Sequence, residues 1–191
     1  MSRKNYKNYL FWQGLITLLL LLLIGGIVSQ FLGNTSLAAA GQSATVIKVI
    51  DGDTIDVKMA QCRLPLNGNP QQCRIRLACI DAPERGQNPF YKEAKNRVKE
   101  LLPPGKTLTL KPRETDVYSR LVAEVLINNQ SVNLQLVREG KAVIFCRYLK
   151  NCPSSQNDFL SAEAAAIKAG LGVWNTQQPW TKMRENHPCR S

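Results

Sequence analysis

The chain has 191 residues, of which 44% are hydrophobic, and Lys plus Arg outnumber Asp plus Glu by 25 to 14, a net charge of +11. The length suits one domain with a proper core, and the apolar content is that of a globular protein rather than of a disordered chain. The basic excess favours a polyanionic partner, a nucleic acid or a membrane surface. Charge alone leaves open a soluble protein that merely happens to be basic.

Residues 1–40 stand apart from the rest of the chain. Three basic residues and no acid precede the apolar run 10–29, which has about the length that spans a bilayer. The small residues before Ala40 fit a cleavage site, so a cleaved signal peptide and a retained membrane anchor both stay open. Because positive flanking charge stays in the cytoplasm, either alternative predicts that the following domain is exported, anchored to the membrane or secreted.

The six cysteines all lie in the exported part, where an even count suggests disulfides. The first two bracket a loop rich in Pro, Gly and Asn, so a Cys62–Cys73 bond is expected. Cys146 and Cys152 bracket a second short loop and form the other expected pair. Cys79, within an apolar strand, is expected to be a buried thiol, and the connectivity of Cys189 stays open. With one histidine, His187, and no Cys-x-x-Cys spacing, a zinc site is not expected.

Short strands with alternating polarity are predicted first, over residues 44–50, 53–59 and 73–80. A helix follows, with Asn88 as its cap and Pro89 at its first position, and it ends before the prolines at 103 and 104.

Two more strands are predicted over 106–113 and 120–127, then a short helix over 133–139 and a strand over 142–148. The last helix, 158–170, ends at Gly170 or Gly172. This order predicts an α+β, mainly β fold: a small closed antiparallel barrel with helices packed on it, preceded by an N-terminal hydrophobic helix.

Four of the few acids fall at the ends of predicted strands: Asp51, Asp53, Asp81 and Glu84. If the strands that carry Asp53 and Asp81 are neighbours, their carboxylates converge on a hard cation such as Ca²⁺ or Mg²⁺. Glu84, after the turn that Pro83 stiffens, could reach an adjacent water. Taken singly, each acid is better explained as a strand end or a turn cap, so only their convergence indicates a site.

Two arginines complete this group. Arg76 alternates with apolar residues inside a strand, and Arg120 opens another strand. An arginine within a sheet is unusual unless it is paired or faces a ligand, and its planar fork suits phosphate oxygens. A salt bridge to one of the acids is the structural alternative. Carboxylates for a metal, a carboxylate base and two arginines together indicate phosphoryl transfer.

Five stretches taken in order resemble the thermonuclease family, typified by staphylococcal nuclease: VIKVIDGDTIDV, RIRLACIDAPE, TDVYSRLVAEV, LVREGKAVIFCRY and AEAAAIKAGLGVW. The match covers about residues 44–174 and leaves 175–191 as a tail. Within that tail QQPWTKMR, residues 177–184, is similar to the ends of related secreted bacterial nucleases. The resemblance implies a five-stranded OB-fold Greek-key barrel with three helices, and a Ca²⁺-dependent phosphodiesterase that acts on DNA and RNA and leaves 3′-phosphate ends.

The resemblance also implies a role for each residue that matches the family's motifs. Asp53 and Asp81 would hold Ca²⁺ through their carboxylates and Ala82 through its carbonyl. Glu84 would be the general base, and Arg76 and Arg120 would bind the scissile phosphate. The nucleotide site would be lined by Tyr118 and Tyr148.

The chain departs from the family pattern in three places: Ala82 replaces Thr, Ser119 replaces Gly, and the hairpin over 59–73 is longer. A monomer is expected, with membrane contact through residues 10–29 if these are retained. The alternative function is a catalytically inactive OB-fold module that only binds nucleic acid.

Overall fold

The computed structural model describes residues 41–184 and 187–189, so the expectations for residues 1–40 fall outside it. Within the described ranges, no helix combines the length and apolar character that crossing a membrane requires. Residues 40–191 form one compact unit with its own hydrophobic core.

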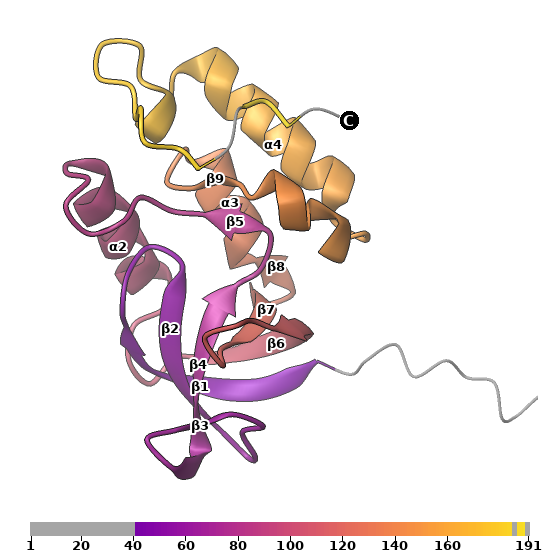
Figure 1. The fold of residues 1–191 in the computed structure, drawn as a ribbon. Coiled ribbons are helices and arrows are strands. Elements are labelled where there is room, and N and C mark those ends of the chain that lie inside the picture. The colour runs from indigo at the N-terminus through magenta and orange to yellow at the C-terminus, as the bar shows by residue number, and fades with distance from the viewer. Residues whose placement is uncertain (1–40, 185–186, 190–191) are drawn as a thin grey trace, which may run out of the picture. The chain divides into compact units, whose positions relative to one another are not determined.

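Five strands close into a barrel in the order β4-β2-β1-β6-β7 (Figure 1). They are β1 Gln42–Val49, β2 Thr54–Met59, β4 Asn69–Leu77, β6 Thr107–Thr115 and β7 Leu121–Ile127. Neighbours are antiparallel except for β4 and β7, which close the barrel as a parallel pair. The expected barrel is confirmed, but not as an all-antiparallel one, because directions cannot alternate around a closed ring with an odd number of strands.

Four two-residue strands complete the sheets: β3 Pro65–Leu66, β5 Ile80–Asp81, β8 Gln130–Ser131 and β9 Val143–Ile144. The predicted strand 73–80 is divided, because Cys79 has φ 64° and turns the chain between β4 and β5. The predicted strand 142–148 is wrong beyond Ile144. Only β9 pairs, with β5, and a 3₁₀ helix, η1 Cys146–Asn151, follows.

Three α-helices of the described part pack against the barrel core: α2 Phe90–Leu101, α3 Val132–Arg138 and α4 Gln156–Ala169. In Figure 1, β3 lies at one end of the barrel and α4 at the other. Asn88 is not the cap of α2, whose N-cap is Pro89 without a side-chain hydrogen bond. Gly170 ends α4 at φ 61°, as expected, and a 3₁₀ turn, η2 Gly172–Trp174, leads into the tail.

All six cysteines form disulfides, and only one of the two expected pairs is confirmed. Cys62 is bonded to Cys73, whereas Cys79 is bonded to Cys152 and Cys146 to Cys189. Cys79 is buried as expected but is not a free thiol. The Cys146–Cys152 pair is wrong because a 3₁₀ helix rises about 2 Å per residue, which separates two residues six apart by about 12 Å, beyond disulfide reach.

One ion-pair cluster joins α2 to α3. Arg97 donates to both carboxylate oxygens of Glu139 at 2.6 and 2.7 Å, and it also pairs with Glu100. Hydrogen bonds from Arg97 are the largest cause that holds the pKa of Glu139 below its ordinary value of 4.5.

We expect Glu139→Gln to lower the free energy of unfolding by about 1 kcal/mol at pH 7. Because the folded-state pKa is lowered, this contribution is present above pH 4.5 and is lost as the pH falls through the folded-state value. Urea unfolding of both proteins at pH 7 and at acid pH measures it. A difference that stays constant down to pH 2 would contradict the assignment.

Candidate active site

The first acids lie on the turn between β1 and β2. The N–H of Ile50 donates to the carbonyl of Thr54 at 2.9 Å, and the N–H of Asp53 donates to the Asp51 carboxylate at 3.1 Å. Asp51 therefore accepts a hydrogen bond from the backbone of its own turn. Gly52 is needed for space, because a Cβ there would lie 2.8 Å from the Cβ atoms of both Ala82 and Ala94. The turn is thus wedged between the Asp81–Ala82 segment and α2.

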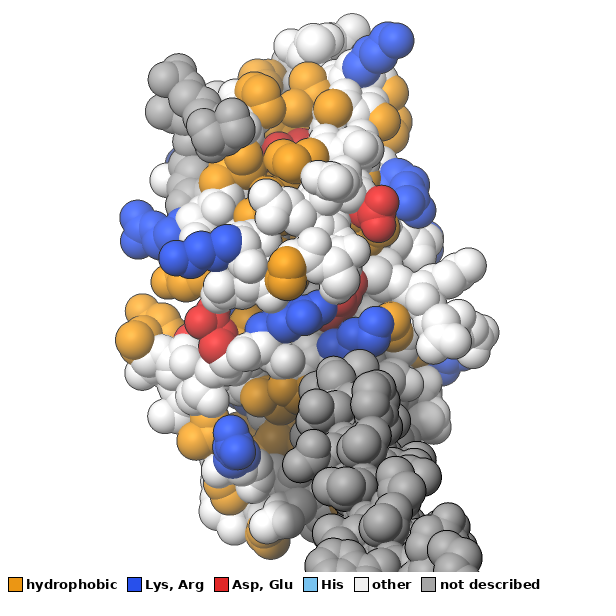
Figure 2. All heavy atoms as spheres, turned by 90° about the vertical axis from the view of Figure 1, so that its right-hand side faces the viewer, with side chains coloured by type: hydrophobic (Ala, Val, Ile, Leu, Met, Phe, Trp, Pro, Cys, Tyr) orange, Lys and Arg blue, Asp and Glu red, His pale blue; other side chains and the backbone are white. Residues whose placement is uncertain are grey.

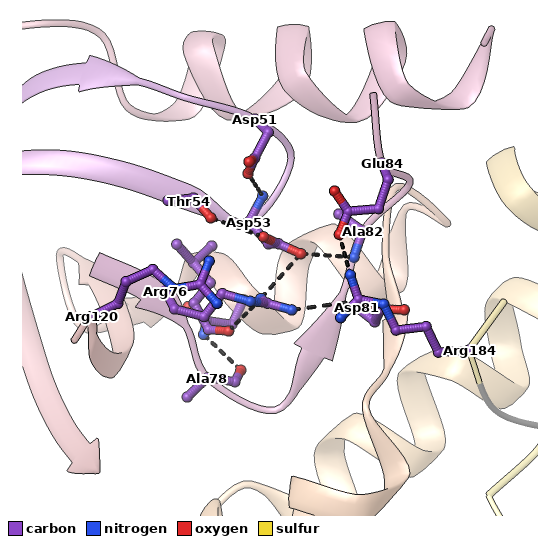
Figure 3. A network of polar contacts seen from close by, with 12 residues as sticks. Asp51, Asp53, Thr54, Arg76, Ala78, Asp81, Ala82, Glu84, Arg120 and Arg184 are labelled. Atoms are coloured by element: carbon purple, nitrogen blue, oxygen red, sulfur yellow. Dashed lines mark hydrogen bonds and ion pairs between the residues drawn. The ribbon is translucent and has the colours of Figure 1, made fainter. Parts of the chain in front are cut away.

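Asp53 projects from this turn toward the end of β5. Its Oδ2 accepts the N–H of Ala82 at 2.9 Å, and its Oδ1 accepts the Thr54 hydroxyl at 3.1 Å (Figure 3). Asp53 and Asp81 are both buried. The inferred convergence of these two carboxylates is therefore present, although it comes from β2 and β5 rather than from two long neighbouring strands.

Arg76 links the two carboxylates from inside the barrel wall. The register of β2 and β4 sets Thr54 opposite Arg76. The Arg76 Nη1 lies 3.0 Å from Asp53 Oδ2 and donates to the Leu77 carbonyl, while Nη2 lies 3.6 Å from Asp81 Oδ1. Its side chain is only 9% exposed, and its close polar contacts are made by Nη1, so the structural alternative, a salt bridge to an acid, is present.

Glu84 stands at the rim, with its side chain 53% exposed. Its backbone N–H donates to the side-chain oxygen of Gln87 at 2.7 Å, which fixes the turn after Pro83. In Figure 3 the carboxylate points toward the space beside Asp53 and Asp81. Among the carboxylates of Asp53, Asp81 and Glu84, that of Glu84 is therefore the most exposed to solvent. A group that exchanges a proton with water needs such access.

Arg120 approaches from the β6–β7 loop. Asp116 accepts the backbone N–H of Arg120 at 3.0 Å and its Nε at 2.7 Å. Burial acts to raise the pKa of Asp116, but these hydrogen bonds outweigh it and leave the pKa below its ordinary value. Among the described residues the two terminal nitrogens of Arg120 have no protein partner. Ser119, which replaces the family's glycine, keeps the left-handed backbone at φ 58°.

Two cavities meet at this end of the barrel. The carboxylate cavity, about 460 Å³, is lined by residues that include Asp53, Glu84 and Arg120. The aromatic cavity, also about 460 Å³, is lined by residues that include Tyr118, Phe145 and Tyr148. The structure thus brings both predicted substrate-binding tyrosines to one hollow beside the carboxylates.

The carboxylates suit a divalent cation. Asp81 Oδ1 is buried and accepts no hydrogen bond, although the Nε of Arg184 and the Nη2 of Arg76 lie 3.4 and 3.6 Å from it. Burial raises the pKa of Asp81 to about 6, even though Arg184 and Arg76 act to lower it. An ionised carboxylate kept from water and left without a hydrogen bond is costly, and a hard cation would remove that cost.

Arg184 is the site residue that sequence reasoning missed. It ion-pairs with Glu84, and its Nε lies 3.4 Å from Asp81 Oδ1. It reaches the site from the tail, one hundred residues after Glu84, where there is no periodicity to indicate a contact. The one sequence clue is that it ends the stretch similar to the tails of secreted nucleases.

Figure 2 shows one side of the molecule, on which basic side chains are scattered among acidic ones and form no single patch. Arg76, Arg120 and Arg184 line one cleft, which makes that cleft a candidate for binding a polyanion.

Comparisons with known proteins agree with this geometry. Residues 74–176 match the family described as Staphylococcal nuclease homologue. The Haemophilus influenzae protein named Uncharacterized endonuclease is 31% identical over 134 residues, which cover 70% of this chain and 67% of that protein. The micrococcal nuclease of Shigella flexneri is 32% identical over 147 residues, 71% of this chain and 76% of that protein.

Endonuclease YhcR of Bacillus subtilis is 32% identical over 160 residues, which cover 76% of this chain but only 12% of that much longer protein. The fold, the site and these similarities define the class, a hydrolase of the nuclease type. The chain belongs to the staphylococcal nuclease family.

The wedged turn gives a first test of the site. We expect Gly52→Ala to destabilise the protein by about 1–3 kcal/mol, because the new methyl group must push the turn away from Ala82 and Ala94. Thermal unfolding measures the loss. The double variant Gly52→Ala/Ala82→Gly should recover part of it, since one of the two opposing methyl groups is gone. A fully additive loss would contradict the close packing described here.

Proposed function

We propose that this protein is an exported, Ca²⁺-dependent nuclease that hydrolyses phosphodiester bonds of DNA and RNA. One observation carries the proposal: Asp53, Glu84, Arg76 and Arg120, all predicted from the sequence, line one cavity, and the buried Asp81 lies next to them, 3.6 Å from Arg76. The comparisons support the nuclease class, and the buried Asp81 oxygen that accepts no hydrogen bond supports a bound cation.

In the proposed assignment Asp53, Asp81 and the carbonyl of Ala82 hold Ca²⁺. Ca²⁺ prefers such oxygen ligands and supplies charge that stabilises the developing negative charge on the phosphate. The side chain at position 82 need not be threonine, because the ligand is backbone. Arg76 lies between the two aspartates, offsets their mutual repulsion and holds them in place.

Glu84 is the proposed general base. Its exposed carboxylate can accept the proton of a water that attacks the phosphorus, while the two aspartates remain as ligands. Attack in line with the 5′ oxygen as leaving group would give a 3′-phosphate end.

Arg120 and Arg76 have unequal shares in binding the phosphate. Arg120 is oriented through its Nε by Asp116 and presents both terminal nitrogens, an arrangement suited to bidentate contact with a phosphate. The Nη1 of Arg76 is occupied by Asp53 and the Leu77 carbonyl, and the side chain is only 9% exposed, so Arg76 offers fewer accessible donors than Arg120. Together they would stabilise the extra negative charge of the transition state.

Tyr118 and Tyr148 are proposed to bind the nucleoside. Tyr118 is 76% exposed and carries the Arg120 guanidinium 5.3 Å from its ring centroid. Tyr148 packs edge-on against Phe145 with centroids 4.8 Å apart. Exposed rings beside a phosphate site are typical of surfaces on which single-stranded bases stack.

Export is proposed from residues 1–40 and is supported by the use of all six cysteines in disulfides, which persist in oxidising compartments. We propose a monomer, either held by residues 10–29 or released near Ala40. Protease treatment of intact cells, followed by N-terminal sequencing, tests both points; a protected domain with reduced cysteines would contradict export.

The direct test of the function uses residues 41–191 and a single-stranded DNA or RNA oligonucleotide, with Ca²⁺ or with a chelator. Cleavage only with Ca²⁺, leaving 3′-phosphate ends, is the expected result. Salt-sensitive binding without cleavage would instead indicate the non-catalytic binding module.

Glu84→Gln should lower kcat by about 10²–10⁴-fold, because the amide cannot accept the proton of water. KM should change little if Glu84 acts mainly in the transition state. The matched control is Glu93→Gln on α2, whose carboxylate pairs with Lys141 outside the site. Full activity of Glu84→Gln would remove the assignment.

Asp53 and Asp51 form a matched pair for the metal. Asp53→Asn should weaken Ca²⁺ binding by about 100-fold or more, because a charged ligand is lost. Asp51→Asn should leave Ca²⁺ affinity nearly unchanged, since Asp51 serves the turn. Calorimetric titration of Ca²⁺ measures both. Equal losses in the two variants would show that the turn, and not the ligand, is responsible.

A further inference from the structure

Arg184 takes part in the site without being accounted for by the proposed mechanism. Its Nη2 donates to Glu84, its Nε lies 3.4 Å from Asp81 Oδ1, and its guanidinium carbon lies 5.9 Å from the centroid of the Phe145 ring. In Figure 3 the side chain extends into the cleft beneath Glu84. The side chain remains 46% exposed, so it is at once anchored and open to a ligand.

The C-terminal arm, residues 175–184, is held firmly enough to aim this side chain. Trp180 is buried against Val143 and Val173, and Met183 packs against the same cluster. The indole N–H of Trp180 donates to the Gln87 side-chain oxygen at 3.2 Å. That oxygen also accepts the N–H of Glu84, so one amide group fixes both the arm and the loop of the proposed base.

A disulfide tethers the chain beyond the arm. Cys189, five residues after Arg184, is bonded to Cys146, the neighbour of Phe145. The arm is therefore anchored before Arg184 by Trp180 and after it by a covalent bond. Such a constraint reduces the conformational freedom that Arg184 would lose on binding a ligand.

Arg184 lies where the two cavities join. It lines both the carboxylate cavity and the aromatic cavity, as do Arg76, Tyr118 and Arg120. A polynucleotide with its scissile phosphate at the carboxylates and a base at the tyrosines must pass this junction. Among the described residues, no protein group accepts a hydrogen bond from the Nη1 of Arg184. The N–H groups of this nitrogen therefore remain available to a ligand in the cleft that Arg184 lines.

The charges explain how Arg184 can serve a substrate. Asp51 serves its own turn, Arg120 pairs with Asp116 and Arg74 with Asp56. Among the groups that remain, the three acids Asp53, Asp81 and Glu84 face Arg76, an excess of two negative charges before Arg184 is counted. A bound Ca²⁺ balances that excess without Arg184. In the metal-free protein Arg184 offsets part of it, and in the loaded protein its charge becomes available to a phosphate.

We propose that Arg184 is a third phosphate-binding residue of this nuclease, delivered to the cleft by the C-terminal arm. It balances Asp81 and Glu84 while no Ca²⁺ is bound, and with Ca²⁺ in place it binds a substrate phosphate at the junction of the two cavities. The inference rests on the proposed nuclease function and adds a residue that lies beyond the end of the family match at residue 176.

The decisive variant is Arg184→Gln in residues 41–191, assayed on a single-stranded oligonucleotide with saturating Ca²⁺. We expect KM to rise about tenfold and kcat to change less than about threefold, because a contact to a non-reacting phosphate is made equally before and in the transition state. The slope of log(kcat/KM) against log salt should shrink by about 0.7, the value for one lost contact to a single strand. Arg184→Lys should restore part of the affinity.

Lys182→Gln is the matched control, since it removes one charge from the same arm without touching the site. A KM no higher in Arg184→Gln than in Lys182→Gln would overturn the proposal. A fall in kcat with unchanged KM would also overturn it and would make Arg184 a positioning residue for Glu84. If the unmodified protein does not cleave at all with Ca²⁺, the nuclease proposal itself fails, which keeps the two failures distinct.

Two further measurements test the proposal, and the first of them does not depend on turnover. Calorimetric titration without substrate should show tighter Ca²⁺ binding in Arg184→Gln than in the unmodified protein, because a competing positive charge is gone; equal or weaker binding would contradict the charge exchange. Untethering the arm with Cys146→Ser/Cys189→Ser should raise KM as Arg184→Gln does, and combining the changes should add little. If the effects of the two changes on KM were fully additive, the disulfide would not act through Arg184.

Discussion

The buried contact of Arg76 with Asp53 and Asp81 is the interaction on which the site depends. Two carboxylates that are nearly excluded from water repel each other, and burial already raises the pKa of Asp81 to about 6. One guanidinium between them keeps the pair together at 3.0 and 3.6 Å. Because the arginine comes from β4 and the acids from the turn before β2 and from β5, β2 and β4 must pair before the site exists.

The barrel and the C-terminal arm contribute differently to the site. The barrel supplies rigid elements: a wedged turn for Asp53, a strand interior for Arg76, and a hydrogen-bonded loop for Arg120. The arm supplies one charge on a long side chain, and the arm itself is held by a buried tryptophan and a disulfide. Rigid groups suit metal and transition-state binding, whereas a flexible arginine suits the exchange of one partner for another.

Local sequence patterns predicted most of the barrel strands and the motif residues. They failed where a contact joins segments that are far apart in the sequence. The sequence patterns predicted β1, β2, β6 and β7 to within about two residues at each end, although β2 and β7 are buried along most of their length. The strand expected over 142–148 was wrong beyond Ile144, since an apolar run cannot show that only Val143 and Ile144 find a partner. The Cys79 and Cys146 pairings were missed for the same reason: their partners lie 73 and 43 residues away.

The sequence by itself determined the family, the five-stranded barrel and the residue types for a cation and a phosphate, because these are written in short motifs and alternating strands. It also separated Asp51 from Asp53, since one sits at the corner of the turn and the other one step beyond it. Only the tertiary structure decided that Asp53, Asp81 and Arg76 touch, that Gly52 has no room for a side chain, and that Arg184 reaches Glu84. These facts depend on distances between segments that are remote in the sequence. Closure of the barrel and the disulfides set those distances, and no local sequence pattern encodes them.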